Sequence, residues 1–242
     1  FRRLRDRVGA AEKRGIYVSI MIFEGWGIQF SPKAYKNHPF HPSNNLNSLE
    51  LDTAEDFRLI IHEIKNKRVL EIQEKYLKKL IETVNDLDNV LYEISNENHP
   101  GSTEWQYHMI RFIKDYEKAL GYQHPVGMTF QYKGGSNQAL FDSPADWISP
   151  NAERGFSEDP PLADGKKVII NDTDHLWGLG GNPGWVWKSF LRGMNILFMD
   201  PYDGKVLMQS FDPGWAESIR KNMGYAAEYA KRMDLIHMLP DN

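Results

Sequence analysis

Carboxylate side chains follow two apolar runs of this sequence, and they are its best candidates for chemistry. Asn96-Glu97 comes one residue after the run Val90–Ile94, and Asp172 and Asp174 follow a later run of the same kind. Valine, leucine, tyrosine and isoleucine favour extended backbone, so each group lies where a strand gives way to a loop. Cleavage of a glycosidic bond needs two carboxyl groups, one to protonate the leaving oxygen and one to attack the sugar or activate water. Glycosidic cleavage is therefore the first chemistry that these residues suggest.

Amides and aromatic side chains accompany these carboxylates at the ends of the predicted strands. The whole set is Glu24, Trp26, Asn96, Glu97, Gln131, Tyr132, Asn151, Glu153, Asp172, Asp174, His175, Trp177, Asp200 and Tyr202. Aromatic faces stack on the apolar face of a pyranose, while amides and carboxylates hydrogen-bond its hydroxyls. We expect Glu97 to be catalytic together with Asp172 or Asp174. The residues expected to bind substrate are Asn96, Glu24, Trp26, Gln131, Tyr132, His175 and Trp177.

The elements that would position these residues alternate between strand and helix. Apolar runs bounded by turn residues predict six strands, at Ile16–Phe23, Val90–Ile94, Pro125–Phe130, Ala145–Ser149, Lys167–Asn171 and Met194–Met199. Amphipathic spacing predicts helices at Arg2–Lys13, from Thr53 to about Asp86 with or without a break, and at Thr103–Leu120, Trp185–Arg192 and Trp215–Met233. The segment Ile28–Asp52 is polar and is predicted to be a long loop, and no helix is predicted directly after Phe130.

This alternation indicates an α/β protein with a parallel sheet. The near-continuous apolar run Ile16–Phe23 predicts a strand buried on both faces. Because polar clusters follow nearly every strand, we favour a (β/α)8 TIM barrel over an open doubly wound sheet, which would concentrate them at one switch point. Six strands are too few for a closed barrel, so we expect a single partial barrel over residues 1–242, with its first two βα units upstream of Phe1.

Composition narrows the classes of partner. The net charge is −4 and no long basic run is present, which argues against nucleic acid. No apolar segment approaches the roughly 20 residues of a membrane span. The chain has no cysteine, which removes thiol chemistry, and because an exported protein can also lack cysteine, the compartment stays open. We slightly favour a secreted or periplasmic location over the cytoplasm. We expect an oligo- or polysaccharide substrate and neither a metal nor another cofactor.

The run Val90-Leu91-Tyr92-Glu93-Ile94-Ser95-Asn96-Glu97 resembles the fourth-strand motif of clan A glycoside hydrolases, especially cellulase-like families such as glycoside hydrolase family 5. The resemblance extends over most of the chain and implies that its strands are the third to eighth of a TIM barrel. It also implies that Glu97 is the acid/base and that Asn96 contacts the sugar 2-hydroxyl. The nucleophile would close the seventh strand, which places it at Asp172.

Two departures from the family pattern affect the mechanism. The family uses Glu on the seventh strand, where this chain offers Asp172 and Asp174, and Asp is shorter by ~1.5 Å. Retaining enzymes hold their carboxyl groups ~5–5.5 Å apart and inverting enzymes ~6.5–9.5 Å apart. A shorter acid shifts the separation toward the wider range, so the stereochemical outcome stays open. The choice between Asp172 and Asp174 stays open as well. The family's Arg near the second strand has no counterpart here.

Three other interpretations remain open. A metal-dependent barrel hydrolase could use the ligands Asp172, Asp174, His175, Glu97 and His99. A carbohydrate-binding barrel could have kept the aromatic residues without catalysing a reaction. Asp172 could also simply cap backbone amides at a strand-to-loop corner, as Asp often does.

Overall fold

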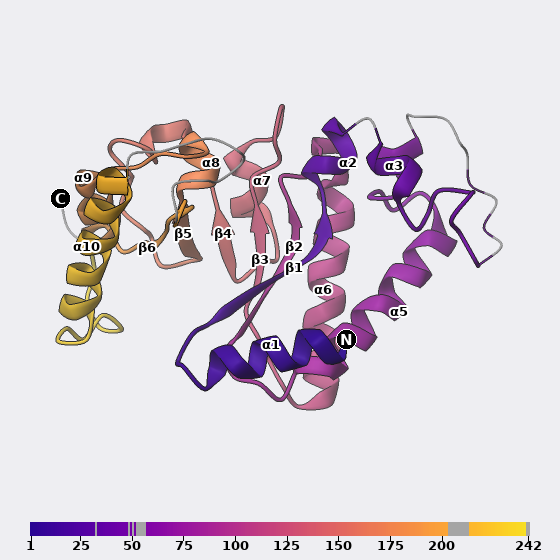
Figure 1. Ribbon diagram of the computed structural model, residues 1–242, viewed down its shortest axis with the longest axis horizontal. Coiled ribbons are helices and arrows are strands. Elements are labelled where there is room, and N and C mark those ends of the chain that lie inside the picture. The colour runs from indigo at the N-terminus through magenta and orange to yellow at the C-terminus, as the bar shows by residue number, and fades with distance from the viewer. Residues whose placement is uncertain (32, 48, 50, 52–56, 203–212, 241–242) are drawn as a thin grey trace. The chain divides into compact units, whose positions relative to one another are not determined.

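The computed structural model describes residues 1–31, 33–47, 49, 51, 57–202 and 213–240. The chain forms two compact units, Phe1–Asp146 and Trp147–Asn242 (Figure 1). Within the described part of the chain, every helix is too short or too polar to span a bilayer.

The first unit contains three strands and most of the helices. Its elements are α1 (Arg2–Glu12), β1 (Val18–Glu24), α2 (Trp26–Phe30), α3 (Ala34–Asn37), α4 (Phe57–Ile60), α5 (Lys67–Val84), β2 (Val90–Asn96), the 3-10 helix η1 (Pro100–Ser102), α6 (Thr103–Leu120), β3 (Val126–Thr129) and α7 (Asn137–Asp142). The strands are parallel and follow chain order, with β2 between β1 and β3. Glu24 lies opposite Asn96 at the end of the β1–β2 ladder, so both polar corners lie at the same edge of this sheet.

Two long amphipathic helices supply the core of the first unit. The buried face of α5 carries Val69, Leu77, Leu80, Ile81 and Val84, and that of α6 carries Trp105, Met109, Ile110 and Ile113. Burying each such side chain contributes about 1.5–3 kcal/mol. The Asn66 side chain caps α5 by accepting the Val69 N–H at 3.1 Å, and Gly121 ends α6 with a left-handed φ of 82°. The predicted helix Thr103–Leu120 is therefore confirmed.

Two predictions about the first unit are wrong, and the extent of one predicted helix is now defined. The segment expected to be a polar loop contains α2 and α3, because Ile28, Tyr35 and Phe40 build a small core of their own with Ile61. The helix predicted from Thr53 to about Asp86, with or without a break, is broken between α4 and α5, and its predicted start at Thr53 lies outside the described residues. A short helix, α7, follows β3 where none was expected.

The first strand also departs from its predicted burial. Ile20 and Ile22 are buried, but Met21 between them is 48% exposed. β1 is therefore not covered on both faces, contrary to the prediction from its apolar run. β3, in contrast, is buried at all four positions.

The second unit contains the other three strands. Its elements are β4 (Trp147–Ser149), the 3-10 helix η2 (Glu153–Gly155), β5 (Val168–Asp172), α8 (Thr173–Trp177), α9 (Pro183–Leu191), β6 (Asn195–Leu197) and α10 (Pro213–Ala230). They pair in parallel in the order β4, β5, β6, with Trp147 opposite Val168 and Asp172 opposite Leu197. The residues Thr173–Trp177, expected to lie in a loop, form helix α8 instead.

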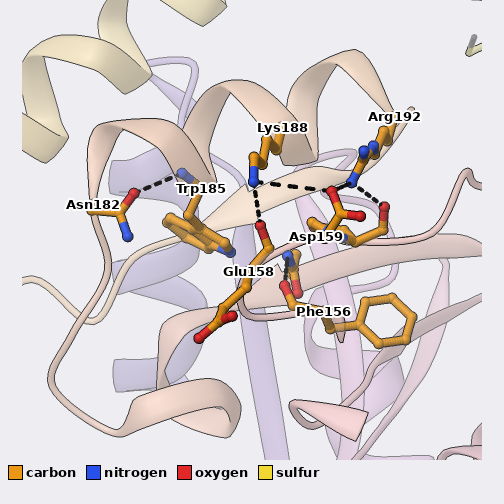
Figure 2. Close-up of polar contacts among 9 residues, drawn as sticks. Phe156, Glu158, Asp159, Asn182, Trp185, Lys188 and Arg192 are labelled. Atoms are coloured by element: carbon orange, nitrogen blue, oxygen red, sulfur yellow. Dashed lines mark hydrogen bonds and ion pairs between the residues drawn. The ribbon is translucent and has the colours of Figure 1, made fainter. Parts of the chain in front are cut away.

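Helix α9 holds the connection between β4 and β5 (Figure 2). Arg192, which follows α9, donates to the Asp159 carboxylate and the Pro160 carbonyl, both at 2.6 Å. Lys188 donates to the Glu158 carbonyl at 2.7 Å. Asn182 caps α9 by accepting the Trp185 N–H at 2.9 Å. The loop leading into β5 is thereby fixed to a helix of its own unit.

The six strands, all parallel where their pairing is described, alternate with helices and confirm the α/β class. The single partial barrel expected over residues 1–242 stays a prediction.

Candidate functional site

Glu97 adopts a backbone conformation that is unusual for its residue type. Its φ is +43°, directly after β2 ends at Asn96. A residue with a Cβ pays about 1–2 kcal/mol in the left-handed region, so such a conformation persists only where its surroundings impose it. Residues held in this way cluster at active sites and ligand-binding sites.

Two side chains impose this conformation. The Gln29 amide donates to the Glu97 carbonyl at 2.7 Å and to the Gly25 carbonyl at 2.9 Å. On the other side, the Thr129 hydroxyl accepts the Glu97 N–H at 3.4 Å and donates to the Ser95 carbonyl at 3.0 Å. Both backbone groups of Glu97 are therefore hydrogen-bonded, the carbonyl to a side chain of helix α2 and the N–H to a side chain of strand β3.

Helix α2 is itself tied to the end of β2. The Glu24 carboxylate accepts the N–H groups of Gly27 at 2.5 Å and Ile28 at 3.0 Å, so it caps this helix. At Gly25 a Cβ would lie 2.4 Å from the Asn96 carbonyl oxygen, and only glycine permits that approach. Glu24 is thus occupied with backbone amides, and its role here is to position α2. Asn96 is half-buried opposite it in the sheet.

Aromatic side chains form a cluster at the carboxyl ends of β1 and β3. The Trp26 and Phe30 rings lie 5.5 Å apart on α2, and Tyr132 meets Phe30 edge-on at 5.5 Å. Trp26 is 45% exposed and Tyr132 is 38% exposed. We call Trp26, Phe30 and Tyr132 the aromatic platform. It brings together two residues that the sequence predicts to bind substrate.

Gln131 has a structural role. Its amide nitrogen donates to the His99 carbonyl at 2.9 Å and to the Ser102 hydroxyl at 3.1 Å, and its oxygen accepts from the Thr103 hydroxyl at 3.0 Å. The side chain is buried. Gln131 therefore stabilises the loop after Glu97. Both its amide nitrogen and its amide oxygen are engaged within the protein and not by a sugar.

Buried neutral histidines support the same loop. Asn98 donates to His62 Nδ1 and to the Ser95 hydroxyl, both at 2.9 Å. Burial lowers the pKa of His62 to about 3, and its ring stacks on Trp105 with centroids 4.5 Å apart. His99 pairs with the Leu59 carbonyl at 3.0 Å, and burial lowers its pKa as well.

In the second unit, Asp172 ends β5 and starts α8. Its Oδ1 accepts the Asp174 N–H at 2.9 Å, which caps the helix. The side chain is buried, with the residue 9% exposed. Burial, together with the nearby Asp174 charge, raises the pKa of Asp172 to about 7, although the hydrogen bond from Asp174 opposes the shift. Near neutral pH this carboxyl can therefore either give or take a proton.

His175 lies beside Asp172 and pairs with Ser149 of β4. The Ser149 Oγ and His175 Nδ1 are 2.7 Å apart, and the same nitrogen is 4.0 Å from Asp172 Oδ2. Burial lowers the pKa of His175 to about 4, so the imidazole is neutral and the 4.0 Å contact is not an ion pair. Because serine and aspartate approach the same ring nitrogen, this group lacks the relay geometry of a serine hydrolase, in which they meet opposite nitrogens.

The other predicted residues of the second unit differ in accessibility. Asp174 is half-buried in the first turn of α8, and burial raises its pKa. Trp177 is 38% exposed and meets the buried Trp185 edge-on at 5.7 Å. Asp200 binds Arg220 through two hydrogen bonds of 2.7 and 2.8 Å, which lower the pKa of this carboxyl and give it a structural role.

The structure thus brings the predicted residues together as two groups. Around Glu97 in the first unit lie Asn96, Glu24, Trp26, Gln131 and Tyr132; in the second unit lie Asp172, Asp174, His175 and Trp177. Sequence reasoning missed three residues, Gln29, Thr129 and Ser149. A polar residue three positions after Trp26, the spacing of neighbours on one helix face, was the available signal for Gln29.

Among the described residues, no three His, Asp or Glu side chains are grouped closely enough to hold a metal ion. Comparison with protein-family models and with curated proteins finds no match for this chain.

Proposed function

We propose that this protein hydrolyses O-glycosidic bonds in an oligo- or polysaccharide, with Glu97 as general acid/base. The observation that carries the proposal is the left-handed backbone of Glu97, fastened on both sides and linked through Gln29 to a helix that presents Trp26. Preorganised carboxylates and exposed aromatic rings are what glycosidic cleavage requires of a protein.

Asp172 supplies the second carboxyl group in this proposal, as nucleophile or as the base that activates water. A pKa near 7 allows it to ionise within the neutral range. Asp174 is the alternative acid, since it lies on the same helix turn and is more accessible. On the same proposal, the six parallel strands belong to a (β/α)8 barrel of the clan A type.

One competing function has an observation in its favour. Asp172 uses an oxygen to cap α8, as a purely structural aspartate would, which fits a barrel that binds carbohydrate without cleaving it. The metal-dependent hydrolase has no such support among the described residues.

The test is a screen of the protein against aryl glycosides and polysaccharides, followed by Glu97→Gln. The matched control is Glu104→Gln, an exposed carboxylate in the first turn of α6. We expect Glu97→Gln to lose at least about a thousandfold in kcat while Glu104→Gln keeps the wild-type rate. Equal activity of the two variants would refute the proposal, and saccharide binding without any turnover would favour the non-catalytic alternative.

A further inference from the structure

Lys133 occupies a rigid turn beside the aromatic platform. Its φ is +55°, and the following Gly134 has a φ of +113°. The turn closes through the Gly135 N–H, which donates to the Gln131 carbonyl at 3.0 Å. At Gly135 a Cβ would lie 2.4 Å from that same oxygen, so the chain is tightly folded back on itself.

The base of this turn is fixed to the loop that follows Glu97. Gln131 makes hydrogen bonds of 2.9 and 3.1 Å to His99 and Ser102, as described above. Lys133 is therefore presented by a framework that also contains the proposed acid, and not by a free-standing loop.

The Lys133 ammonium lies over the aromatic platform. Its Nζ is 5.0 Å from the centroid of the Phe30 ring and 5.7 Å from that of Tyr132. A cation over aromatic faces is attracted by their quadrupole, which holds the long side chain in place. Since the Trp26 ring is 5.5 Å from Phe30, the ammonium lies within reach of a short saccharide stacked on Trp26.

Among the residues that the structure describes, no Asp or Glu oxygen lies within 4.0 Å of Lys133 Nζ. Two other lysines of the first unit are paired, Lys65 with Glu63 and Lys114 with Asp146, each at 2.6 Å. The charge of Lys133 is thus held in place where the proposed substrate would lie, with no carboxylate partner among the described residues.

We infer that the substrate carries an anionic group, a carboxylate or a sulfate ester, on a sugar unit next to the one that stacks on Trp26. This inference rests on the proposed function and names its substrate class. Lys133 would be a specificity-determining residue: it would pair with the anion and take no part in bond cleavage.

Matched pairs of saccharides that differ only in charge provide the test. Trigalacturonic acid is compared with its fully methyl-esterified form, and a sulfated galactose trisaccharide with the unsulfated one. Binding is measured by calorimetry on the Glu97→Gln protein, so that the saccharide is not consumed. The same measurement is made with Lys133→Gln, with Lys133→Arg, and with Lys118→Gln as an exposed-lysine control on α6.

We expect at least one anionic saccharide to bind about three- to tenfold more tightly than its neutral partner. Lys133→Gln should abolish the difference, whereas Lys133→Arg and Lys118→Gln should preserve it. Raising NaCl to about 0.5 M should reduce it, because salt screens exposed charges. Which pair shows the difference distinguishes a carboxylate from a sulfate.

The inference is overturned if every neutral saccharide binds as well as its anionic partner, or if the preference survives in Lys133→Gln. Cleavage of neutral saccharides that depends on Glu97, with no anionic preference, leaves the proposed function standing and removes only this inference. Lys133-dependent binding with no cleavage by the wild-type protein removes the proposed function and leaves the inference. If no saccharide is bound or cleaved, both fail.

Discussion

Replacing Glu97 by glycine and by alanine separates the strain of its backbone from the loss of its carboxylate. Both changes remove the carboxylate and the methylene next to it. The two variants differ only in the Cβ, which alanine keeps and glycine lacks. At a φ of +43° the left-handed conformation costs about 1–2 kcal/mol for a residue with a Cβ and nothing for glycine. Glycine also loses more entropy on folding, by about 0.4–1 kcal/mol. We therefore expect Glu97→Gly to be more stable than Glu97→Ala by about 0.5–1 kcal/mol.

The assay is urea unfolding of the two variants. Their midpoints report the difference in stability if the two variants have the same m-value. The matched control is the same pair of changes at Glu104, in helix α6 with ordinary helical backbone. There we expect the opposite order, with glycine less stable than alanine by about 1 kcal/mol. Both Glu97 variants should lack hydrolytic activity. If alanine is the more stable choice at position 97 as well, the backbone is not strained there, and the argument that marks Glu97 as functional loses its basis.

Three further predictions concern pH and stability. If Asp172 is nucleophile or base, kcat should rise as pH passes about 7, where this buried carboxyl ionises, and a falling limb there would make it the acid. The hydrogen bond that His124 Nδ1 donates to the Glu117 carboxylate at 2.7 Å raises the pKa of His124. The stabilisation from protonated His124 is therefore complete below the pKa of about 6.5 in the unfolded chain. It is lost as pH rises through the higher pKa of His124 in the folded protein. The free energy of unfolding should fall over that range in the wild type, and a fall of the same size in His124→Gln would contradict this. Arg192→Ala removes the hydrogen bonds to Asp159 and Pro160 and should lower the free energy of unfolding by about 1 kcal/mol, through the bond to the Pro160 carbonyl. Amide exchange over residues 156–160 should then accelerate, and unchanged exchange would show that this loop does not depend on Arg192.

The sequence was sufficient to predict the strands and long helices because local signals define them. Runs of valine, isoleucine and leucine mark β2 and β5, and Gly121 ends α6 where a left-handed residue is needed. The alternation of these elements then indicates the parallel α/β class, which the strand pairing confirms.

The short helices could not be predicted because contacts distant in the chain stabilise them. Besides the local Glu24 cap, helix α2 depends on the close approach of Gly25 to Asn96 and on the hydrogen bond from Gln29 to Glu97, which only the paired strands create. Helices of this length are marginal without tertiary contacts. The roles of the strand-end residues could not be predicted for the same reason. Gln131, for example, is buried because it hydrogen-bonds a loop that is distant from it in the chain.

The central claim is that Glu97 and Asp172 act in one reaction, and a double-variant cycle tests it most directly. The rate of saccharide hydrolysis is measured for the wild type, Glu97→Gln, Asp172→Asn and the double variant. Residues that act as a unit are not additive, so each single change should lose at least about a thousandfold and the double variant should be no slower than the slower single one. Losses that multiply, or a single variant with the wild-type rate, would contradict the claim.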